Sequence, residues 1–268
     1  MFADRLTDGN PLAVVHDADD LSDDQLAAIA SWTNLSETAF LLRPTLPGAD
    51  YRVRIFTVEQ ELPFAGHPTL GSAAAWLAAG GRPRRPGRFV QECGAGLVPI
   101  RTDGPLVAFA APPTIRSGPV SDADLAELTE WLGVAPADVL DARWVDNGPG
   151  WVGLLLRDAA TVLGLRPSGP GRIRDVGVIG RHPAGAECDV EVRALFAVGG
   201  GVAEDPVTGS LNASLAQWLI GCDALPPAYV AAQGTVLGRR GRVHIRAEDG
   251  EVWVGGHVTA GVSGSIAI

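Results

Sequence analysis

The sequence predicts an α+β protein that is rich in β-strand and built from two similar domains. Short alternating apolar runs fill most of the 268-residue chain, whereas helical periodicity is confined to a few stretches. The 34 glycines and 20 prolines are spread along the whole chain, which is typical of many short strands joined by tight turns. One motif also occurs twice, each time before a run of small residues, and such a repeat indicates duplication.

The first half of the chain shows two helical patterns among strand patterns. In the first helix Ser22 is the expected N-cap and Gln25 closes a capping box. The second helix follows His67 and is ended by Gly80 and Gly81. Alternating apolar residues predict strands at 11–15, 36–42, 51–57, 88–92, 96–102 and 106–110.

The second half begins after the best linker candidate, "APPTIRSGP" at 111–119, whose prolines and small polar residues interrupt the periodic pattern. Ser121 caps a predicted amphipathic helix that runs to about residue 133, and a second helix covers 208–221. Strand patterns lie at 143–148, 151–158, 175–181 and 188–197, and the tail from Arg242 alternates like two further strands.

Charge and composition exclude several classes of function. The formal net charge of −10 argues against binding to nucleic acid or to anionic membrane, because both need a basic surface. All 21 basic residues are arginine, so a P-loop lysine, a Schiff-base lysine and lysine-bound pyridoxal phosphate are excluded. No apolar run approaches the roughly 20 residues that span a bilayer, and the first residues do not resemble a secretion signal.

The cysteines and histidines do not suggest a disulfide framework or a metal site. Cys93, Cys188 and Cys222 are far apart and form no CxxC, which is typical of reduced thiols in a cytoplasmic protein. The five histidines have no HxH or HxxxH spacing, so we expect no metal. No glycine-rich stretch matches a nucleotide fingerprint, and we therefore expect no cofactor.

The duplicated motif reads [H/D]-P-x-x-G-S. It occurs as "HPTLGSAAAWL" at 67–77 and as "DPVTGSLNASL" at 205–215, and each copy follows a strand that carries an arginine and ends in phenylalanine. A proline that opens a helix leaves first-turn N–H groups unpaired, and the helix dipole adds partial positive charge there. Two such helix starts related by a pseudo-twofold axis would form one cleft that binds a carboxylate without lysine.

Within that cleft the motif residues have distinct expected roles. Gly71 and Gly209 let a ligand approach the backbone, and the amides around Ser72 and Ser210 hold its carboxylate. The acid–base groups His67 and Asp205 then face each other across the ligand, as proton transfer requires. The alternative is that both residues merely cap their helices, although a cap does not need the same Gly-Ser pair in both halves.

In these blocks the sequence resembles the PhzF family, the phenazine-biosynthesis-type isomerases. "GNPLAVV", "NLSETAFL", "ELPFAGHPTLGSA", "VAEDPVTGS" and "QGTVLGRRGRV" occur in the family's order over nearly the whole chain. The resemblance implies a diaminopimelate epimerase-like fold, in which each of two like domains is a mostly antiparallel barrel around a central helix. We expect these domains at 1–112 and 113–268, with a last strand at 262–268 that pairs back into the first domain.

The resemblance also assigns residues and an activity. It makes Glu37 of "NLSET" the general acid/base, has His67 and Asp205 assist in binding and proton handling, and places Gly66, Gly209 and Ser210 against the substrate. Family members shift protons on small carboxylic acids and are often homodimers. The implied function is a cofactor-independent isomerase acting on a small unsaturated, cyclic carboxylic acid.

Two other classes of function stay open. An amino-acid epimerase or racemase could use His67 and Asp205 as a two-base pair, since neither motif holds the cysteine that thiol-type members of this fold use. A non-catalytic ligand-binding protein on the same scaffold is the other alternative, because a fold does not by itself establish turnover.

Overall fold

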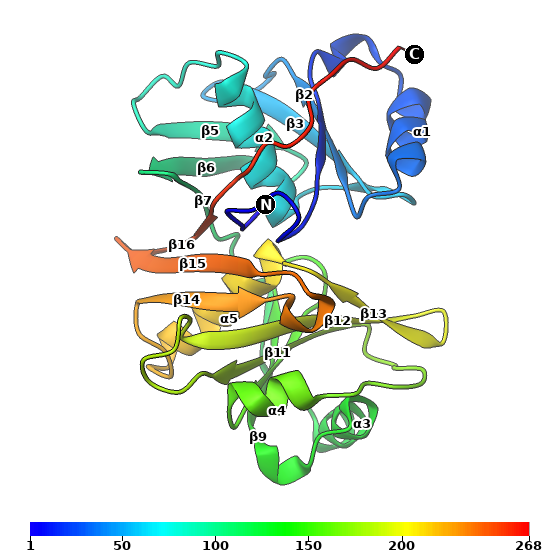
Figure 1. The fold of residues 1–268 in the computed structure, drawn as a ribbon, viewed down its shortest axis with the longest axis vertical. Coiled ribbons are helices and arrows are strands. Elements are labelled where there is room, and N and C mark those ends of the chain that lie inside the picture. The colour runs from blue at the N-terminus through cyan, green and yellow to red at the C-terminus, as the bar shows by residue number, and fades with distance from the viewer. Residues whose placement is uncertain (268) are drawn as a thin grey trace. The chain divides into compact units, whose positions relative to one another are not determined.

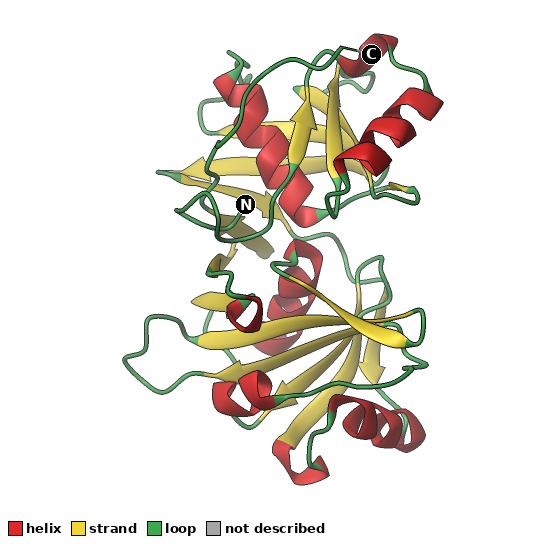
Figure 2. Cartoon of the chain, turned by 45° about the vertical axis from the view of Figure 1, so that its right-hand side comes forward, coloured by secondary structure: helices red, strands yellow, loops and turns green. Residues whose placement is uncertain are grey.

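The computed structural model describes residues 1–267, which fold as two compact units (Figures 1 and 2). Unit 1 consists of Met1–Ala110 together with the segment from Gly255, and unit 2 consists of Ala111–Val254. The expected linker is only partly irregular, because Arg116–Pro119 forms strand β8 and pairs with β9.

Unit 1 is a mixed sheet with few helices. Its strands lie in the order β1-β2-β3-β5-β6-β7, with β4 on the outside of β3. Neighbours are antiparallel except β1 with β2 and β3 with β5, which are parallel. The elements are β1 Ala13–Val15, the 3-10 turn Ala18–Asp20, α1 Asp23–Thr33, β2 Thr38–Leu42, β3 Tyr51–Phe56, β4 Glu61–Leu62, α2 Gly66–Ala78, β5 Arg88–Cys93, β6 Gly96–Asp103 and β7 Leu106–Ala110.

Helix α2 forms the core of unit 1. It contacts β1, β2 and β3 near one end of the strand order and β7 at the other end, so the sheet curves around it (Figure 1). Its first eight residues, Gly66 to Ala73, are all buried, which explains an Ala-rich sequence that is apolar on every side.

Unit 2 is built in the same way. Its strands lie in the order β16-β15-β14-β12-β11-β10-β9-β8, with β13 on β12. Strand β10 is parallel to β11 and β12 is parallel to β14, whereas β8–β9, β9–β10, β11–β12, β12–β13 and β14–β15 are antiparallel. The elements after β8 are α3 Asp122–Leu132, the 3-10 turn Pro136–Asp138, β9 Val139–Asp146, β10 Val152–Leu156, α4 Ala159–Gly164, β11 Asp175–Arg181, β12 Val190–Val198, β13 Gly201–Asp205, α5 Gly209–Gly221, β14 Ala228–Gln233, the 3-10 turn Thr235–Leu237, β15 Gly241–Glu248 and β16 Glu251–Gly256.

Helix α5 is held very close to its sheet. It contacts both β9 and β15. A Cβ atom on Gly177 would lie 2.2 Å from a methyl group of Leu211, and one on Gly153 would lie 2.9 Å from Leu215. A side chain at either strand position would displace these leucines, so glycine lets the helix pack close to the strand backbone.

The order of elements is repeated between the units. The series β1-α1-β2-β3-β4-α2-β5-β6-β7 recurs as β10-α4-β11-β12-β13-α5-β14-β15-β16. The parallel pairs β1–β2 and β3–β5 recur as β10–β11 and β12–β14. In this shared order of elements, α2 and α5 occupy corresponding positions.

The predicted helix caps are confirmed, whereas the predicted final strand is not formed. Ser22 and Gln25 form a complete capping box on α1, and Ser121 caps α3. Residues 257–267 have no strand assignment, and residue 268 of the expected 262–268 strand lies outside the described residues. This segment instead runs along unit 1 (Figures 1 and 2), where Ala3 donates its N–H to the His257 carbonyl and Thr259 donates its hydroxyl to the Ala3 carbonyl.

Candidate active site

Glu37 lies in the tight connection between α1 and β2. Helix α1 ends at Thr33, and the next residue, Asn34, adopts the left-handed conformation that stops a helix. The hydroxyls of Thr33 and Thr38 are 2.8 Å apart and join the end of the helix to the start of the strand. The Glu37 side chain is 16% exposed, so a carboxyl group sits largely buried on a braced backbone.

His67, the second residue of α2, meets that carboxyl group. Its Nε2 atom lies 3.3 Å from Oε2 of Glu37, and its side chain is only 4% exposed. The structure thus brings together two predicted site residues that are thirty positions apart in the sequence.

The imidazole of His67 is neutral at ordinary pH. Burial and, to a smaller extent, the charge of the Met1 amino group lower its pKa from 6.5 to about 3, and a hydrogen bond to the backbone of Pro11 acts in the opposite direction. The contact with Glu37 is therefore one between a carboxyl group and a neutral ring, and not a salt bridge between full charges.

Asn10 determines which ring nitrogen of His67 carries the proton. Its side-chain nitrogen Nδ2 lies 3.4 Å from Nδ1 of His67. With the amide in this orientation its nitrogen donates, so we infer that Nδ1 accepts and that the single proton of the neutral ring resides on Nε2. The 3.3 Å contact of Nε2 with Oε2 of Glu37 does not have hydrogen-bond geometry in this structure.

The start of α2 differs from the expected one. The helix begins at Gly66, two residues before Pro68, because proline is tolerated throughout the first helical turn and not only at its first position. Gly71 and Ser72 consequently lie in the second turn, where their N–H groups bond to carbonyls of the preceding turn. Their amides are not the open ones of this helix, and those of Gly66 and His67 take that place.

Gly71 also has a packing role that the sequence did not indicate. A Cβ atom there would lie 2.4 Å from a methyl group of Leu12, which precedes β1. The glycine lets this side chain reach the helix backbone. Ser72 is fully buried on the same helix.

In unit 2, Asp205 is the last residue of β13 and leads into α5. The Thr208 hydroxyl donates to its Oδ2 atom at 2.5 Å, and Nε2 of Gln233 donates to its backbone carbonyl at 3.2 Å. The Gln233 amide also accepts from Thr208 N and from Asn212, so it ties strand β14 to the start of the helix. Asp205 is held on both its backbone and its side chain.

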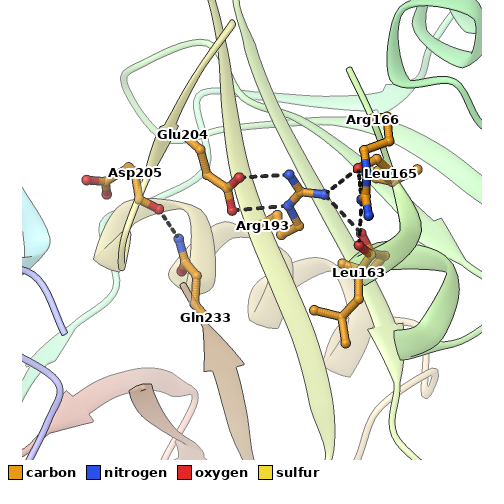
Figure 3. Close-up of polar contacts among 8 residues, drawn as sticks. Leu163, Leu165, Arg166, Arg193, Glu204, Asp205 and Gln233 are labelled. Atoms are coloured by element: carbon orange, nitrogen blue, oxygen red, sulfur yellow. Dashed lines mark hydrogen bonds and ion pairs between the residues drawn. The ribbon is translucent and has the colours of Figure 1, made fainter. Parts of the chain in front are cut away.

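The neighbouring residue Glu204 forms a buried ion pair with Arg193 of β12. The arginine donates to both carboxylate oxygens at 3.1 and 2.8 Å, and the two side chains are 5% and 9% exposed. Nη1 of Arg193 also donates to the carbonyls of Val162 and Leu165 at the end of α4. Figure 3 shows the Asp205 carboxylate pointing away from this pair, as expected for adjacent residues of a strand.

The same pairing occurs in unit 1, where Arg54 of β3 donates to both oxygens of Glu61 in β4. In both units a strand arginine therefore fixes the short strand that leads into the motif helix. The arginine noted before each motif copy has this structural role.

Gly209 and Ser210 are the first two residues of α5, so their N–H groups lack partners within the helix. The helix lies within the expected segment 208–221, but Pro206 stands three residues before its first residue and does not open it as expected. Ser210 is contacted from the preceding part of the chain: Nδ2 of Asn147 donates to its carbonyl at 3.0 Å, and Nε1 of Trp151 donates to its hydroxyl at 3.2 Å.

The sequence reasoning missed four polar residues of these sites. Asn10 and Asn147 each precede the first strand of a repeat, and each contacts the start of the motif helix. Extending the motif repeat toward the N-terminus would have found them, because "NPLAVV" and "NGPGWV" occupy corresponding places. Thr208 and Gln233 have no distinguishing sequence signal, since threonine and glutamine are common in turns and strands.

Residues 1–267 contain no group of three or more His, Cys, Asp or Glu side chains placed to hold a metal ion. Within the same range, every helix is too short or too polar to cross a membrane.

A carboxyl group in contact with a neutral imidazole can accept and donate protons, so the site is suited to proton transfer. Comparison with known proteins identifies the family of the chain. A family model described as PhzC-PhzF, phenazine biosynthesis-like protein, matches residues 1–264. The chain therefore belongs to the PhzF family.

Individual relatives agree with this assignment. The trans-2,3-dihydro-3-hydroxyanthranilate isomerase of Pseudomonas aeruginosa is 35% identical over 252 residues, which cover 92% of this chain and 88% of that protein. Antisense-enhancing sequence 1 of Schizosaccharomyces pombe is 40% identical over 175 residues, covering 62% of this chain and 59% of that protein. A solved structure of a predicted epimerase from Pseudomonas aeruginosa has a TM-score of 0.76 and 26% identity, and the match covers 96% of this chain and 93% of the other. The named relatives of the family include isomerases, and this chain is an enzyme of that type.

Proposed function

We propose that the protein is a cofactor-independent isomerase that moves a proton on a small unsaturated, cyclic carboxylic acid. The observation that carries this proposal is the contact between Glu37 and the Nε2–H side of His67. The name of the Pseudomonas aeruginosa isomerase supports the choice of a dihydro-hydroxyanthranilate as the first substrate to test.

In the proposed reaction Glu37 acts as base and then as acid. The carboxylate removes a proton from one ring carbon while the double-bond electrons shift, and the resulting carboxylic acid returns the proton to another carbon on the same face. Substrate and product have the same atoms and charge, so no oxidant or reductant is needed. His67, through Nε2–H, holds the carboxylate in position between the two steps.

The substrate carboxylate is proposed to bind at helix starts. Gly209 and Ser210 at the start of α5, and Gly66 and His67 at the start of α2, present N–H groups where the helix dipole favours an anion. Asp205 is proposed to assist in proton handling. Its carboxylate is oriented by the Thr208 hydroxyl and could accept a proton from the substrate.

A second candidate, an epimerase that uses His67 and Asp205 as two bases, is favoured by one observation. The neutral state of His67 is the one that a base requires. This candidate predicts exchange of a substrate proton from both faces, and it predicts that His67→Gln or Asp205→Asn each stops exchange from one face only.

The test of the first candidate is solvent-deuterium incorporation into trans-2,3-dihydro-3-hydroxyanthranilate, followed by proton NMR. We expect Glu37→Gln to lower incorporation by at least about a hundredfold while binding of the substrate persists. Glu59→Gln, which changes an exposed glutamate of unit 1, is the matched control and retains wild-type incorporation. Unchanged incorporation in Glu37→Gln would reject the role of this residue.

We further propose that the enzyme acts as a homodimer, as the family resemblance implies, and in the cytoplasm, as the three unpaired cysteines of the sequence suggest. Light scattering coupled to size exclusion measures the assembly directly. A monomer at micromolar concentration would contradict the proposed homodimer.

A further inference from the structure

Asn147 lies in the connection between β9 and β10 and is 8% exposed. Its Nδ2 atom donates to the carbonyl of Ser210 at 3.0 Å. Because a carbonyl only accepts, this bond fixes which side of the amide is nitrogen and which is oxygen.

The opposite side of that amide is an acceptor that has no donor. Oδ1 of Asn147 is buried, and no group in residues 1–267 donates a hydrogen bond to it. A buried carbonyl without a donor is destabilising, and such groups in native proteins call for a specific explanation. A bound molecule that supplies the donor is one such explanation.

The surroundings of this acceptor are those of a ligand site. Ser210 and Gly209 open α5 with N–H groups that have no partner within the helix, and such groups suit a carboxylate. The connection that carries Asn147 is braced, because Oδ1 of Asp146 accepts from the N–H groups of Gly148 and Gly150 at 2.7 and 2.8 Å. The unpaired acceptor of Asn147 therefore lies on a braced connection that is bonded to the first turn of α5.

We propose that Asn147 is a substrate-binding residue whose Oδ1 atom accepts a hydrogen bond from an amino or hydroxyl group adjacent to the substrate carboxylate. The inference rests on the proposed function for the place of the carboxylate at the start of α5. It narrows the substrate class to acids that carry a hydrogen-bond donor on the carbon next to the one that bears the carboxylate.

The duplicated topology provides an independent argument. Asn10 stands at the corresponding place before β1, and its Nδ2 atom contacts the motif residue His67 at the start of α2. In unit 1 the asparagine thus contacts a side chain of the proposed site. Its counterpart in unit 2 contacts only the backbone of Ser210 through Nδ2, which leaves the oxygen available for a ligand.

The experiment compares anthranilate with 2-methylbenzoate by isothermal titration calorimetry on the full chain. The two acids have nearly the same shape, but only anthranilate carries a donor beside the carboxylate. We expect the wild-type protein to bind anthranilate about five- to tenfold more tightly, which is the usual effect of one hydrogen bond. In Asn147→Leu this preference should fall to within about twofold.

Trp151→Phe is the matched control, because it removes the neighbouring hydrogen bond to the Ser210 hydroxyl and leaves Asn147 in place. It should change the affinity for both acids equally and retain the preference. Equal affinities in the wild-type protein, or a preference that persists in Asn147→Leu, would overturn the inference.

A crystal structure of the wild-type protein with anthranilate tests the same point without a variant that could misfold. The amino group within hydrogen-bond distance of Oδ1 supports the inference, and an ordered water in its place overturns it. Neither acid is turned over, so these results are independent of deuterium incorporation. A preference for anthranilate without deuterium incorporation would reject the proposed function alone. Deuterium incorporation without that preference would reject this inference alone.

Discussion

Nε2 of His67 lies 3.3 Å from Oε2 of Glu37, and the Asn10 amide on the opposite side of the ring favours a proton on that nitrogen. The three residues come from a helix, from the connection before a strand and from the segment before β1. Because the ring is neutral, the chain Asn10–His67–Glu37 carries one negative charge at most, which the carboxylate can give up by accepting a proton.

The first prediction concerns the tautomer of the His67 ring. Asn10→Asp replaces a donor with an acceptor, so the proton of His67 should move to Nδ1 and leave a lone pair on Nε2 facing Glu37. We expect deuterium incorporation to fall about a hundredfold, because the carboxylate then loses the N–H group that orients it.

Nitrogen-15 NMR of the His67 ring checks the cause directly. The wild-type protein should show a protonated Nε2, and the Asn10→Asp variant a protonated Nδ1. A variant that keeps the wild-type tautomer would contradict the role given to Asn10, whatever its activity.

The second prediction concerns stability and pH. The folded-state pKa of His67 is about 3, below the usual 6.5. Between these values the unfolded chain binds a proton at this histidine and the folded chain does not, so stability is lost as pH falls below 6.5, by about 1.4 kcal/mol per unit. Between pH 7.5 and pH 5, the wild-type protein should therefore lose about 2 kcal/mol more than His67→Gln.

Urea unfolding at a series of pH values measures this difference. The exposed His16 provides the control, and His16→Gln should follow the wild-type curve. Parallel curves for the wild-type protein and His67→Gln would show that His67 does not have the depressed pKa.

The third prediction compares the two arginine–glutamate pairs. Arg193→Leu leaves the Glu204 carboxylate buried without a counter-charge, so we expect a loss of about 3–5 kcal/mol in the free energy of unfolding. Arg54→Leu breaks the corresponding pair in unit 1, whose side chains are 18% and 42% exposed, and should cost only about 0–1 kcal/mol.

The double variant Arg193→Leu with Glu204→Leu separates the buried charge from the lost contacts. It should be more stable than Arg193→Leu alone, since no charge is then left unpaired. A double variant that is less stable than the single one would show that packing, and not charge, determines the effect.

The fourth prediction concerns Gly71. Gly71→Ala would place a methyl group 2.4 Å from the Leu12 side chain, and we expect overpacking to cost about 1–3 kcal/mol. Gly221→Ala at the end of α5 is the control, because a Cβ atom there meets nothing within 4 Å, and it should leave stability unchanged or raise it by up to about 1 kcal/mol. Thermal unfolding measures the stability of both variants. Equal melting temperatures would exclude the close contact between residue 71 and Leu12.

Much of the local structure followed from the sequence because its signals are local. The capping box of Ser22 and Gln25 needs only residues within one helical turn, and the structure forms it. The helix start at Gly66 could not be read in the same way, since Pro68 is compatible with any position of a first turn. The alternating residues 262–267 resembled a strand, yet pattern alone cannot say whether a neighbouring strand is present to pair with.

The candidate site shows the same limit. The motif copies identified His67 and Asp205, but Glu37 entered only through the family resemblance, because one glutamate in a short connection has no pattern of its own. Its contact with His67 is a product of tertiary folding, as are the contacts of Asn10 and Asn147 with the two motif helices. The assignment of Glu37, Asp205 and the substrate-binding residues remains a prediction that the variants above will decide.

The way in which unit 1 uses both ends of the chain affects its biosynthesis. The backbone of Ala3 is held by His257 and Thr259, which leave the ribosome only after all of unit 2 has been synthesised. Unit 2 is continuous and can fold while translation proceeds, whereas unit 1 stays unfinished until the last residues emerge. A ribosome stalled before Gly255 would therefore carry an N-terminal half that remains sensitive to proteases.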